Sequence, residues 1–263
     1  MKKKALILGI ESSCDETAAS ILEESNESVP NLLSNIVSSQ EEIHKKFGGV
    51  VPELAARSHI DKIDLIVDKA LKKSGKKLSD IDAIAVTGGP GLIVCLSVGL
   101  NFAKTLAMTL KKPLIVVNHL EGHALSPKLI TDLDYPYLLL LISGGHSQYL
   151  AVKKLGKYKR LGTTIDDAVG EAFDKTAKLL GIKFPGGPFI EKFAAKGNKD
   201  RLQPPLLNIG FGKLYLFASP FFAKISICGP PGNSIPRSFA VLSKASPNAS
   251  SIVVPILLYF PRP

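Results

Sequence analysis

The chain has 263 residues, enough for one large domain or two modest ones with a core of their own. Apolar residues make up 45% and charged residues 21%, as in an ordinary soluble globular protein, and the net charge is +10. Three cysteines without paired spacing argue against a disulfide framework and indicate a reducing compartment. We expect a cytoplasmic protein with no membrane partner, because residues 5–10 are too few for a signal peptide and no segment approaches the length of a membrane span.

The positive charge is unevenly distributed. Residues 201–263 contain six basic side chains and no acidic one, so residues 1–200 hold 27 basic against 23 acidic groups. This mild excess is compatible with nucleic-acid binding, but charge alone favours an ordinary solvated surface.

The first half of the chain predicts a hairpin, a helix and further strand and helix elements. Strands are expected at residues 5–10, 18–22, 32–38, 83–86 and 114–117, and helices at 52–73 and 92–110. Pro52 suits the first turn of the first helix, and Gly75 ends it. Residues 11–17 are expected to form a polar turn, and residues 88–91 a glycine-rich loop.

The second half begins in the same way. Strands are expected at residues 137–142, 147–153 and 158–162, followed by a helix at 168–180 that Gly181 closes. Each half therefore opens with a hairpin around a polar or glycine-rich turn. This weak internal symmetry predicts an α/β fold of two lobes that face each other across a cleft.

Residues 204–263 differ from the rest. Ten of the eighteen prolines lie in residues 201–263, and strand-like runs such as 250–259 show no helical periodicity. We predict a first lobe at 1–130, the start of a second lobe at 131–203, and a tail at 204–263 that is disordered or inserted.

Two histidines have a spacing that suits a metal. His119 and His123 stand at i and i+4, so on a helix they share a face and can hold one divalent ion together with a third ligand, usually a carboxylate. The alternative is a pair of surface or capping residues. Leu120 occupies the place of the general-base glutamate in the HExxH motif of metalloproteases, so the segment is not that motif.

Two turns have the composition of a phosphate-binding loop. Ser143-Gly144-Gly145-His146-Ser147 follows a predicted strand, its small residues let backbone N–H groups approach a phosphate, and its second glycine permits a positive φ. The polar turn at residues 11–17 is predicted to pair with it. The alternative for both is an ordinary hairpin turn.

Acidic residues and a second glycine pair follow. Asp167, Glu171 and Asp174 share a helix face, from which they could approach a ribose or a metal-bound group. The alternative is that these acids, with Asp166, cap the N-terminus of the helix and complement its dipole. Residues 185–188, Pro-Gly-Gly-Pro, read as a rigid loop with open backbone amides, or as a simple linker.

Taken together, these segments resemble one family, the tRNA N6-adenosine threonylcarbamoyltransferases, formerly called O-sialoglycoprotein endopeptidases. Seven collinear motifs carry the resemblance across residues 5–203: LGIESSCDET (8–17), FGGVVPELA (47–55), GGPGL (88–92), HLEGH (119–123), LISGGHSQ (141–148), IDDAVGEAFDKTAKLLG (165–181) and FPGGP (184–188).

The resemblance implies a fold and a reaction. It implies the two-lobed fold of actin, sugar kinases and heat-shock chaperone ATPases, with the second lobe incomplete. The implied reaction passes the threonylcarbamoyl group of threonylcarbamoyl-AMP to N6 of adenosine 37 in tRNAs that read codons beginning with A. Other subunits of the synthesis complex are the implied partners.

The resemblance also implies the site residues. His119 and His123 would hold one divalent metal per chain, iron first and zinc as the alternative. Contacts to the substrate are implied for these residues: Leu141, Ile142, Ser143, Gly144, Gly145, Asp174 and Gly187. The family's third metal ligand, an aspartate, and an asparagine that contacts the nucleotide come from a later portion, and residues 204–263 contain no aspartate.

Alternatives to an active transferase follow from that departure. The chain is expected to be C-terminally truncated or rearranged. One explanation is an insertion at residues 204–259, after which the family sequence resumes with FPRP at 260–263. The other is a frameshift near residue 204. An inactive family member that keeps only partner binding is one alternative function. A metalloendopeptidase is the other, and Leu120 argues against it.

Overall fold

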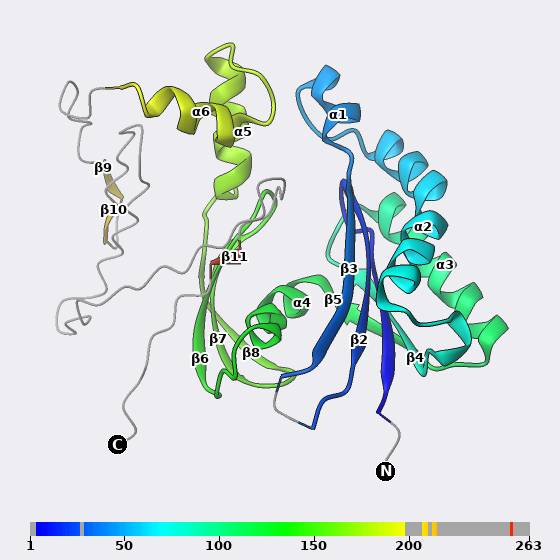
Figure 1. The fold of residues 1–263 in the computed structure, drawn as a ribbon. Helices are drawn as coiled ribbons and strands as arrows, with labels where there is room; N and C mark the ends of the chain where they lie inside the picture. The colour runs from blue at the N-terminus through cyan, green and yellow to red at the C-terminus, as the bar shows by residue number, and fades with distance from the viewer. Residues whose placement is uncertain (1–3, 27–28, 198–206, 210–211, 215–252, 255–263) are drawn as a thin grey trace, which may run out of the picture.

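The computed structural model describes residues 4–26, 29–197, 207–209, 212–214 and 253–254. Its main elements are two β-sheets, with helices against one face of the first sheet and beside the second (Figure 1). The strand-like run predicted at 250–259 contributes only Val253–Val254 to the described residues, and the predicted disorder or insertion of 204–263 falls almost wholly outside them.

The first sheet has five strands in the order β3-β2-β1-β4-β5. The strands are β1 (Leu6–Glu11), β2 (Glu16–Glu23), β3 (Asn31–Ser39), β4 (Ala83–Gly89) and β5 (Leu114–Asn118). The first three are antiparallel neighbours, whereas β4 lies parallel to β1 and β5 parallel to β4. The carboxyl ends of β1, β4 and β5 therefore meet at one edge of the sheet.

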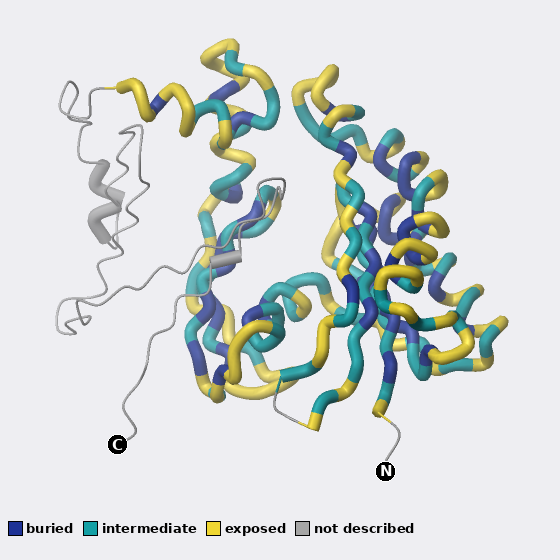
Figure 2. The backbone as a smooth tube through the Cα atoms, in the orientation of Figure 1, coloured by how far each residue is buried: buried dark blue, intermediate teal, exposed yellow. Residues whose placement is uncertain are grey.

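Helices α2 (Pro52–Ser74) and α3 (Ile93–Leu110) cover one face of this sheet. Alternate residues of β1 point to that face, so Leu6, Leu8 and Ile10 are buried under the helices. Figure 2 shows buried stretches of the backbone in dark blue in this sheet and in its helices. Pro52 begins α2, and Gly75 ends it with a left-handed φ of 68°. Both helices lie where the apolar spacing predicts them.

Helix α3 is, by length and composition alone, apolar enough to cross a membrane, so the expectation that no segment approaches the length of a membrane span is wrong. It packs against α2 and β4 through a stripe of small residues and one leucine: Cys95, Leu96, Gly99, Ala103 and Ala107. A single helix of this kind is weak evidence for a membrane span, because helices of soluble proteins meet the same criterion.

The second sheet is antiparallel, with the order β11-β6-β7-β8. Its strands are β6 (Tyr137–Ile142), β7 (Ser147–Lys154), β8 (Lys157–Thr163) and the short β11 (Val253–Val254). Leu139, Leu141, Leu150 and Val152 form a second core with Ala124 of α4 (His119–Leu125). Helix α4 thus connects the edge of the first sheet to the second sheet.

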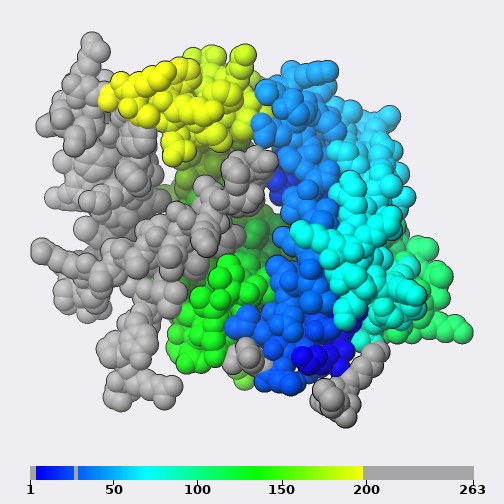
Figure 3. Space-filling model, viewed as in Figure 1, coloured from blue at the N-terminus to red at the C-terminus, as the bar shows by residue number. Residues whose placement is uncertain are grey.

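The remaining elements are short. Helix α5 (Val169–Leu179) follows β8 and packs against α6 (Gly186–Ala194), and both lie at the same end of the molecule as α1 (Glu41–His44) (Figure 3). Turns of 3-10 helix occur at Lys45–Phe47, Leu78–Asp80 and Ser126–Leu129. Strands β9 (Leu207–Ile209) and β10 (Gly212–Leu214) form a separate antiparallel pair.

One prediction about this region is wrong. Residues 185–188 do not form an open loop, since Pro185 is the N-cap of α6 and Gly186, Gly187 and Pro188 form its first turn. A proline near the first turn of a helix costs no hydrogen bond, because the first N–H groups have no partner inside the helix.

Candidate functional site

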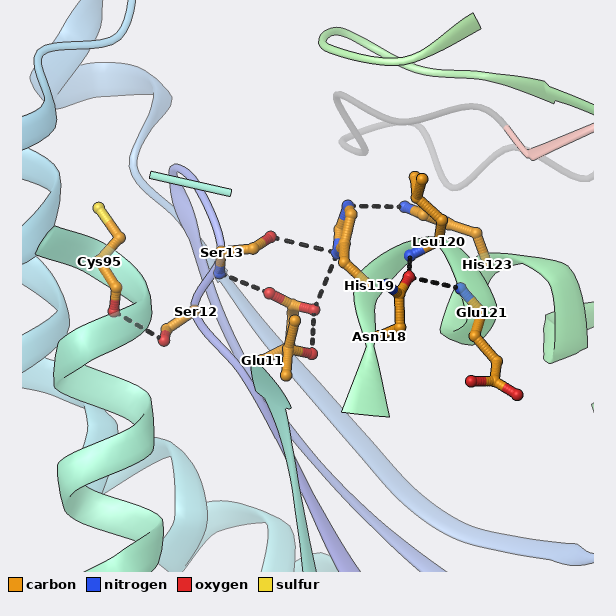
Figure 4. A network of polar contacts seen from close by, with 10 residues as sticks. Glu11, Ser12, Ser13, Cys95, Asn118, His119, Leu120, Glu121 and His123 are labelled. Carbon is orange, nitrogen blue, oxygen red and sulfur yellow. Dashed lines mark hydrogen bonds and ion pairs between the residues drawn. The ribbon is translucent and has the colours of Figure 1, made fainter. Parts of the chain in front are cut away.

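The carboxyl ends of the parallel strands bring the site together. Glu11 ends β1, Thr87 lies near the end of β4, and Asn118 ends β5 immediately before α4. The side chain of Asn118 caps α4 by accepting hydrogen bonds from the N–H groups of Leu120 and Glu121, at 2.9 and 3.3 Å. This cap fixes the first turn of α4, from which His119 projects toward Glu11 (Figure 4).

The two histidines of α4 face each other, as their spacing predicts. Nε2 of His119 lies 3.1 Å from Nε2 of His123, and the rings meet edge to face with their centroids 4.5 Å apart. Two nitrogens that bind one metal at about 2.0–2.1 Å are roughly 3 Å apart, so this separation fits either a shared metal or a hydrogen bond between the rings.

The described residues do not place a third metal-binding side chain next to the two histidines. Among the residues that the structure describes, no group of three or more His, Cys, Asp or Glu side chains could hold a metal ion. His146 is the nearest further imidazole, but its ring centroid lies 5.9 Å from that of His119. A metal held by this pair would therefore take its further ligands from outside the described cluster.

Glu11 is held by three donors. Thr87 Oγ1 donates to its Oε2 at 2.6 Å, the N–H of Ser13 donates to its Oε1 at 2.5 Å, and His119 Nδ1 lies 3.2 Å from its Oε2. Burial by itself would raise the pKa of this carboxyl, but the hydrogen bonds from His119, Thr87 and Ser13 lower it to about 2. Glu11 is thus a carboxylate at neutral pH.

Two further histidines of the site, His123 and His146, have lowered pKa values. Burial and the neighbouring His119 lower the pKa of His123 to about 4. Burial, with a smaller contribution from His119, also lowers the pKa of His146. Neutral imidazoles have a free nitrogen lone pair, which is the state that binds a metal.

The glycine-rich turn lies beside the histidines. Leu141 and Ile142 end β6, and the N–H of Ser143 donates to His146 O at 2.7 Å, which closes the turn. Neither Gly144 nor Gly145 has a positive φ, so the turn does not use the conformational freedom that its second glycine permits. A Cβ added at either glycine would meet nothing within 4 Å, so the space over the turn is open.

Helix α5 packs closely on this turn. The N–H groups of Gly170 and Glu171 donate to the carbonyls of Ser143 and Gly144, at 3.3 and 3.2 Å. A Cβ at Gly170 would lie 2.7 Å from Gly144 Cα, so only glycine permits this approach.

The predicted acidic face separates into two parts. Asp167 and Glu171 share Lys175, whose Nζ lies 2.7 and 3.0 Å from their carboxylates. Asp174 points the other way and accepts the N–H of Gly186 at 2.6 Å, where burial raises its pKa although that hydrogen bond opposes the shift. Gly187 is next to this contact at the start of α6. Both residues lie on the α5–α6 unit, apart from the histidine pair.

Sequence reasoning placed Glu11 in the polar turn at residues 11–17 but not beside the histidine pair, and it missed Thr87 altogether. A signal was available: each directly follows a predicted apolar strand, and parallel strands bring such ends to one edge, where α/β folds bind ligands. Glu11 and Thr87 also line a hollow of about 300 Å³ on the sheet face opposite α2 and α3.

The fold and site define an α/β protein with a mixed sheet, at whose carboxyl edge a carboxylate and a histidine pair meet. The model of the tRNA N6-adenosine threonylcarbamoyltransferase family matches residues 31–241. The chain therefore belongs to this family.

Curated relatives agree. The tRNA N6-adenosine threonylcarbamoyltransferase of Pelagibacter ubique is 70% identical over 212 residues, which are 80% of this chain and 59% of that protein. The one from Brucella anthropi is 57% identical over 199 residues, 76% of this chain and 55% of that protein. The chain thus spans less than two thirds of the length of these relatives.

Solved structures are more distant. A Pseudomonas aeruginosa protein described as similar to peptidase YeaZ has a TM-score of 0.40 and 19% identity over 60% of this chain and 64% of that chain. Component A of (R)-2-hydroxyglutaryl-CoA dehydratase from Acidaminococcus fermentans has a TM-score of 0.42 and 14% identity, over 75% and 61%. These similarities are too low to define the fold.

Proposed function

We propose that this chain transfers the threonylcarbamoyl group of threonylcarbamoyl-AMP to N6 of adenosine 37 in tRNAs that read codons beginning with A. The observation that carries the proposal is the histidine pair, whose Nε2 atoms lie 3.1 Å apart beside an open glycine-rich turn, in a member of this family. Family membership favours this reading over an inactive family member or a metalloendopeptidase.

We place one divalent metal on His119 and His123, with iron as the first choice and zinc as the alternative. When bound there, the metal would supply Lewis acidity toward the carbamoyl carbonyl or the phosphate of the adenylate. Two protein ligands leave the other coordination positions to substrate, water or a further ligand. The lowered pKa of His123 favours the neutral imidazole that a metal ligand requires.

The chain's own residues would position the reactants. In the transfer, N6 of the adenosine attacks the carbamoyl carbon, the bond from that carbon to the phosphate oxygen breaks, AMP leaves with the electron pair, and N6 loses one proton. We propose that Leu141, Ile142, Ser143, Gly144 and Gly145 line the place of the adenylate, because backbone amides beside open space suit an anionic leaving group. Positioning matters most here, since an exocyclic amine is a weak nucleophile.

Asp174 and Gly187 belong to the same proposal, at the α5–α6 side of the substrate. The hydrogen bond from Gly186 to Asp174 supports this placement, because it holds the first turn of α6 in place. The two sheets support an actin-like arrangement of two lobes at 1–130 and 131–203, with 204–263 as a separate segment. We infer a cytoplasmic protein whose partners are tRNA and the other subunits of the synthesis complex.

The transfer reaction tests the function. The full chain is incubated with tRNA, threonine, bicarbonate, ATP and the family's partner subunits, with a full-length relative in parallel, and the digested tRNA is analysed by mass for threonylcarbamoyladenosine. We expect product above the sample without enzyme, and none from His119→Ala. A working relative beside an inactive wild-type chain would contradict the proposed activity.

A further inference from the structure

We infer that Glu11 is a positioning residue that fixes the tautomer and orientation of His119, so that its Nε2 lone pair is presented to the metal. This rests on the metal site of the proposed function. Three observations carry it: the donors that hold the carboxylate, the contact between Glu11 and Nδ1, and the direction in which Nε2 points (Figure 4).

The carboxylate cannot turn away from His119. The N–H of Ser13 occupies Oε1, and the hydroxyl of Thr87 occupies Oε2 from the neighbouring strand β4. These donors are a backbone amide in the turn directly after β1 and a short side chain on β4, so the place of the carboxylate is set by the sheet and this turn. Oε2 then has one further lone pair, which faces His119 Nδ1 at 3.2 Å.

The contact decides which ring nitrogen carries the proton. A carboxylate oxygen only accepts, so Nδ1 must be the N–H in order to donate to it. Ser13 Oγ lies 3.3 Å from the same nitrogen and could donate to it if Nδ1 carried no proton. In that case, however, the lone pair of Nδ1 would face a lone pair of Glu11 Oε2 at 3.2 Å, which is repulsive. The hydroxyl of Ser13 therefore accepts or donates elsewhere, and the neutral ring has its proton on Nδ1.

The other nitrogen is then free. With the proton on Nδ1, Nε2 of His119 has an unshared lone pair that points at Nε2 of His123, 3.1 Å away. In the absence of a metal His123 donates its own Nε2–H to that lone pair, and binding a metal between the rings requires this proton to leave or to move to Nδ1 of His123. A carboxylate behind a ligating histidine is a recurrent arrangement that fixes the ring and raises its basicity.

The test combines two variants and two measurements on the full chain. Glu11→Gln keeps the size and an oxygen that can accept from Ser13, but it presents an NH₂ group to Nδ1 and so favours the opposite tautomer. Glu53→Gln is the matched control, because it makes the same chemical change at an exposed carboxylate of α2 whose ion pair, among the described residues, is with Arg57 on its own helix. Circular dichroism and thermal unfolding establish that both variants are folded.

The first measurement is the imidazole ¹⁵N spectrum of metal-free protein near pH 7.5. We expect His119 with its proton on Nδ1 in the wild type and in Glu53→Gln, and on Nε2 in Glu11→Gln. Wild-type His119 with the proton on Nε2 would overturn the inference, whatever the protein's activity.

The second measurement is the affinity for Zn²⁺, by competition with a chromophoric chelator. We expect Glu11→Gln to bind about 10–100-fold more weakly than the wild type, and Glu53→Gln to bind equally well. Equal affinity in Glu11→Gln would overturn the inference. A wild type that binds no zinc, with the proton nevertheless on Nδ1, would overturn the metal site of the proposed function and leave Glu11 as the residue that orients the ring.

Discussion

Small residues set how closely the loops of the site approach one another. Gly91 packs on the turn after β1, because a Cβ there would lie 2.6 Å from Ser13 O, and the N–H of Leu92 donates to the same oxygen at 2.8 Å. Since the amide of Ser13 holds Glu11, the contact at Gly91 supports the site indirectly.

Gly91→Ala should destabilise the chain and weaken zinc binding, because the methyl group must push Ser13 away. We expect a loss of about 1–3 kcal/mol in the free energy of unfolding, measured with urea. Gly144→Ala is the matched control: its Cβ meets nothing within 4 Å, so stability should change little. Equal stability of the two variants would contradict the prediction that a side chain at Gly91 collides with Ser13.

Asp174 has a structural role that can be separated from contact with substrate. Asp174→Ala removes the acceptor of the Gly186 N–H, 2.6 Å away, and should cost about 1 kcal/mol of stability in urea unfolding. Asp174→Asn keeps an oxygen acceptor and should retain most of that stability. Loss of transfer activity in a stable Asp174→Asn would then indicate a role of the charge itself; equal destabilisation by both changes would contradict the role of the hydrogen bond.

At the scale of elements, a buried polar chain ties α1 and α2 to the turn after β1. The N–H of Val51 donates to His44 Nδ1 at 3.2 Å, so His44 donates from Nε2 to Gln40 at 3.3 Å. Gln40 donates in turn to His59 Nδ1 at 3.3 Å, and His59 Nε2 donates to Cys14 O at 2.9 Å. Both histidines are fully buried and neutral, with the proton on Nε2.

This row of buried hydrogen bonds predicts that the folded state loses stability in acid. Burial lowers the pKa of His44 and of His59, so the unfolded state, with a histidine pKa near 6.5, binds protons more readily than the folded state. The stability is therefore fully present above about pH 6.5 and is lost as the pH falls below it. In urea unfolding at pH 7.5 and 5.5, His59→Gln should lose less stability on acidification than the wild type. An equal loss would contradict the assignment.

At the scale of the whole molecule, stability is concentrated in the first sheet. Among the described elements, its core joins β1, β2 and β4 to α2 and α3, whereas α5 and α6 pack mainly on each other and leave Leu179 88% exposed. Elements with few buried contacts open at lower free energy.

Hydrogen exchange followed by mass spectrometry should reveal this difference. Amides of β1, β4 and α2 should exchange slowly, and those of α6 much faster, within the part of the chain that the structure describes. Comparable protection of β1 and α6 would show that the α5–α6 unit is held by more than the packing seen here.

Sequence periodicity was sufficient for most elements because their signals are local. Helix α2 shows its 3.6-residue spacing between Pro52 and Gly75, and β6 and β7 are short apolar runs around a glycine turn. Helix α6 was not predicted, because its first residues, Gly186 to Pro188, are typical of loops and only packing against α5 makes them helical.

The sequence by itself determined the family motifs, the strands and long helices, and the histidine pair, whose four-residue spacing brings both rings to one face of any helix. Only the tertiary structure showed that Glu11 and Thr87 lie next to that pair. Glu11 and Thr87 are 76 residues apart, and Glu11 and His119 are 108 apart. Their contact depends on parallel strands aligned in one sheet, and that alignment is set by the burial of the whole core rather than by any local pattern.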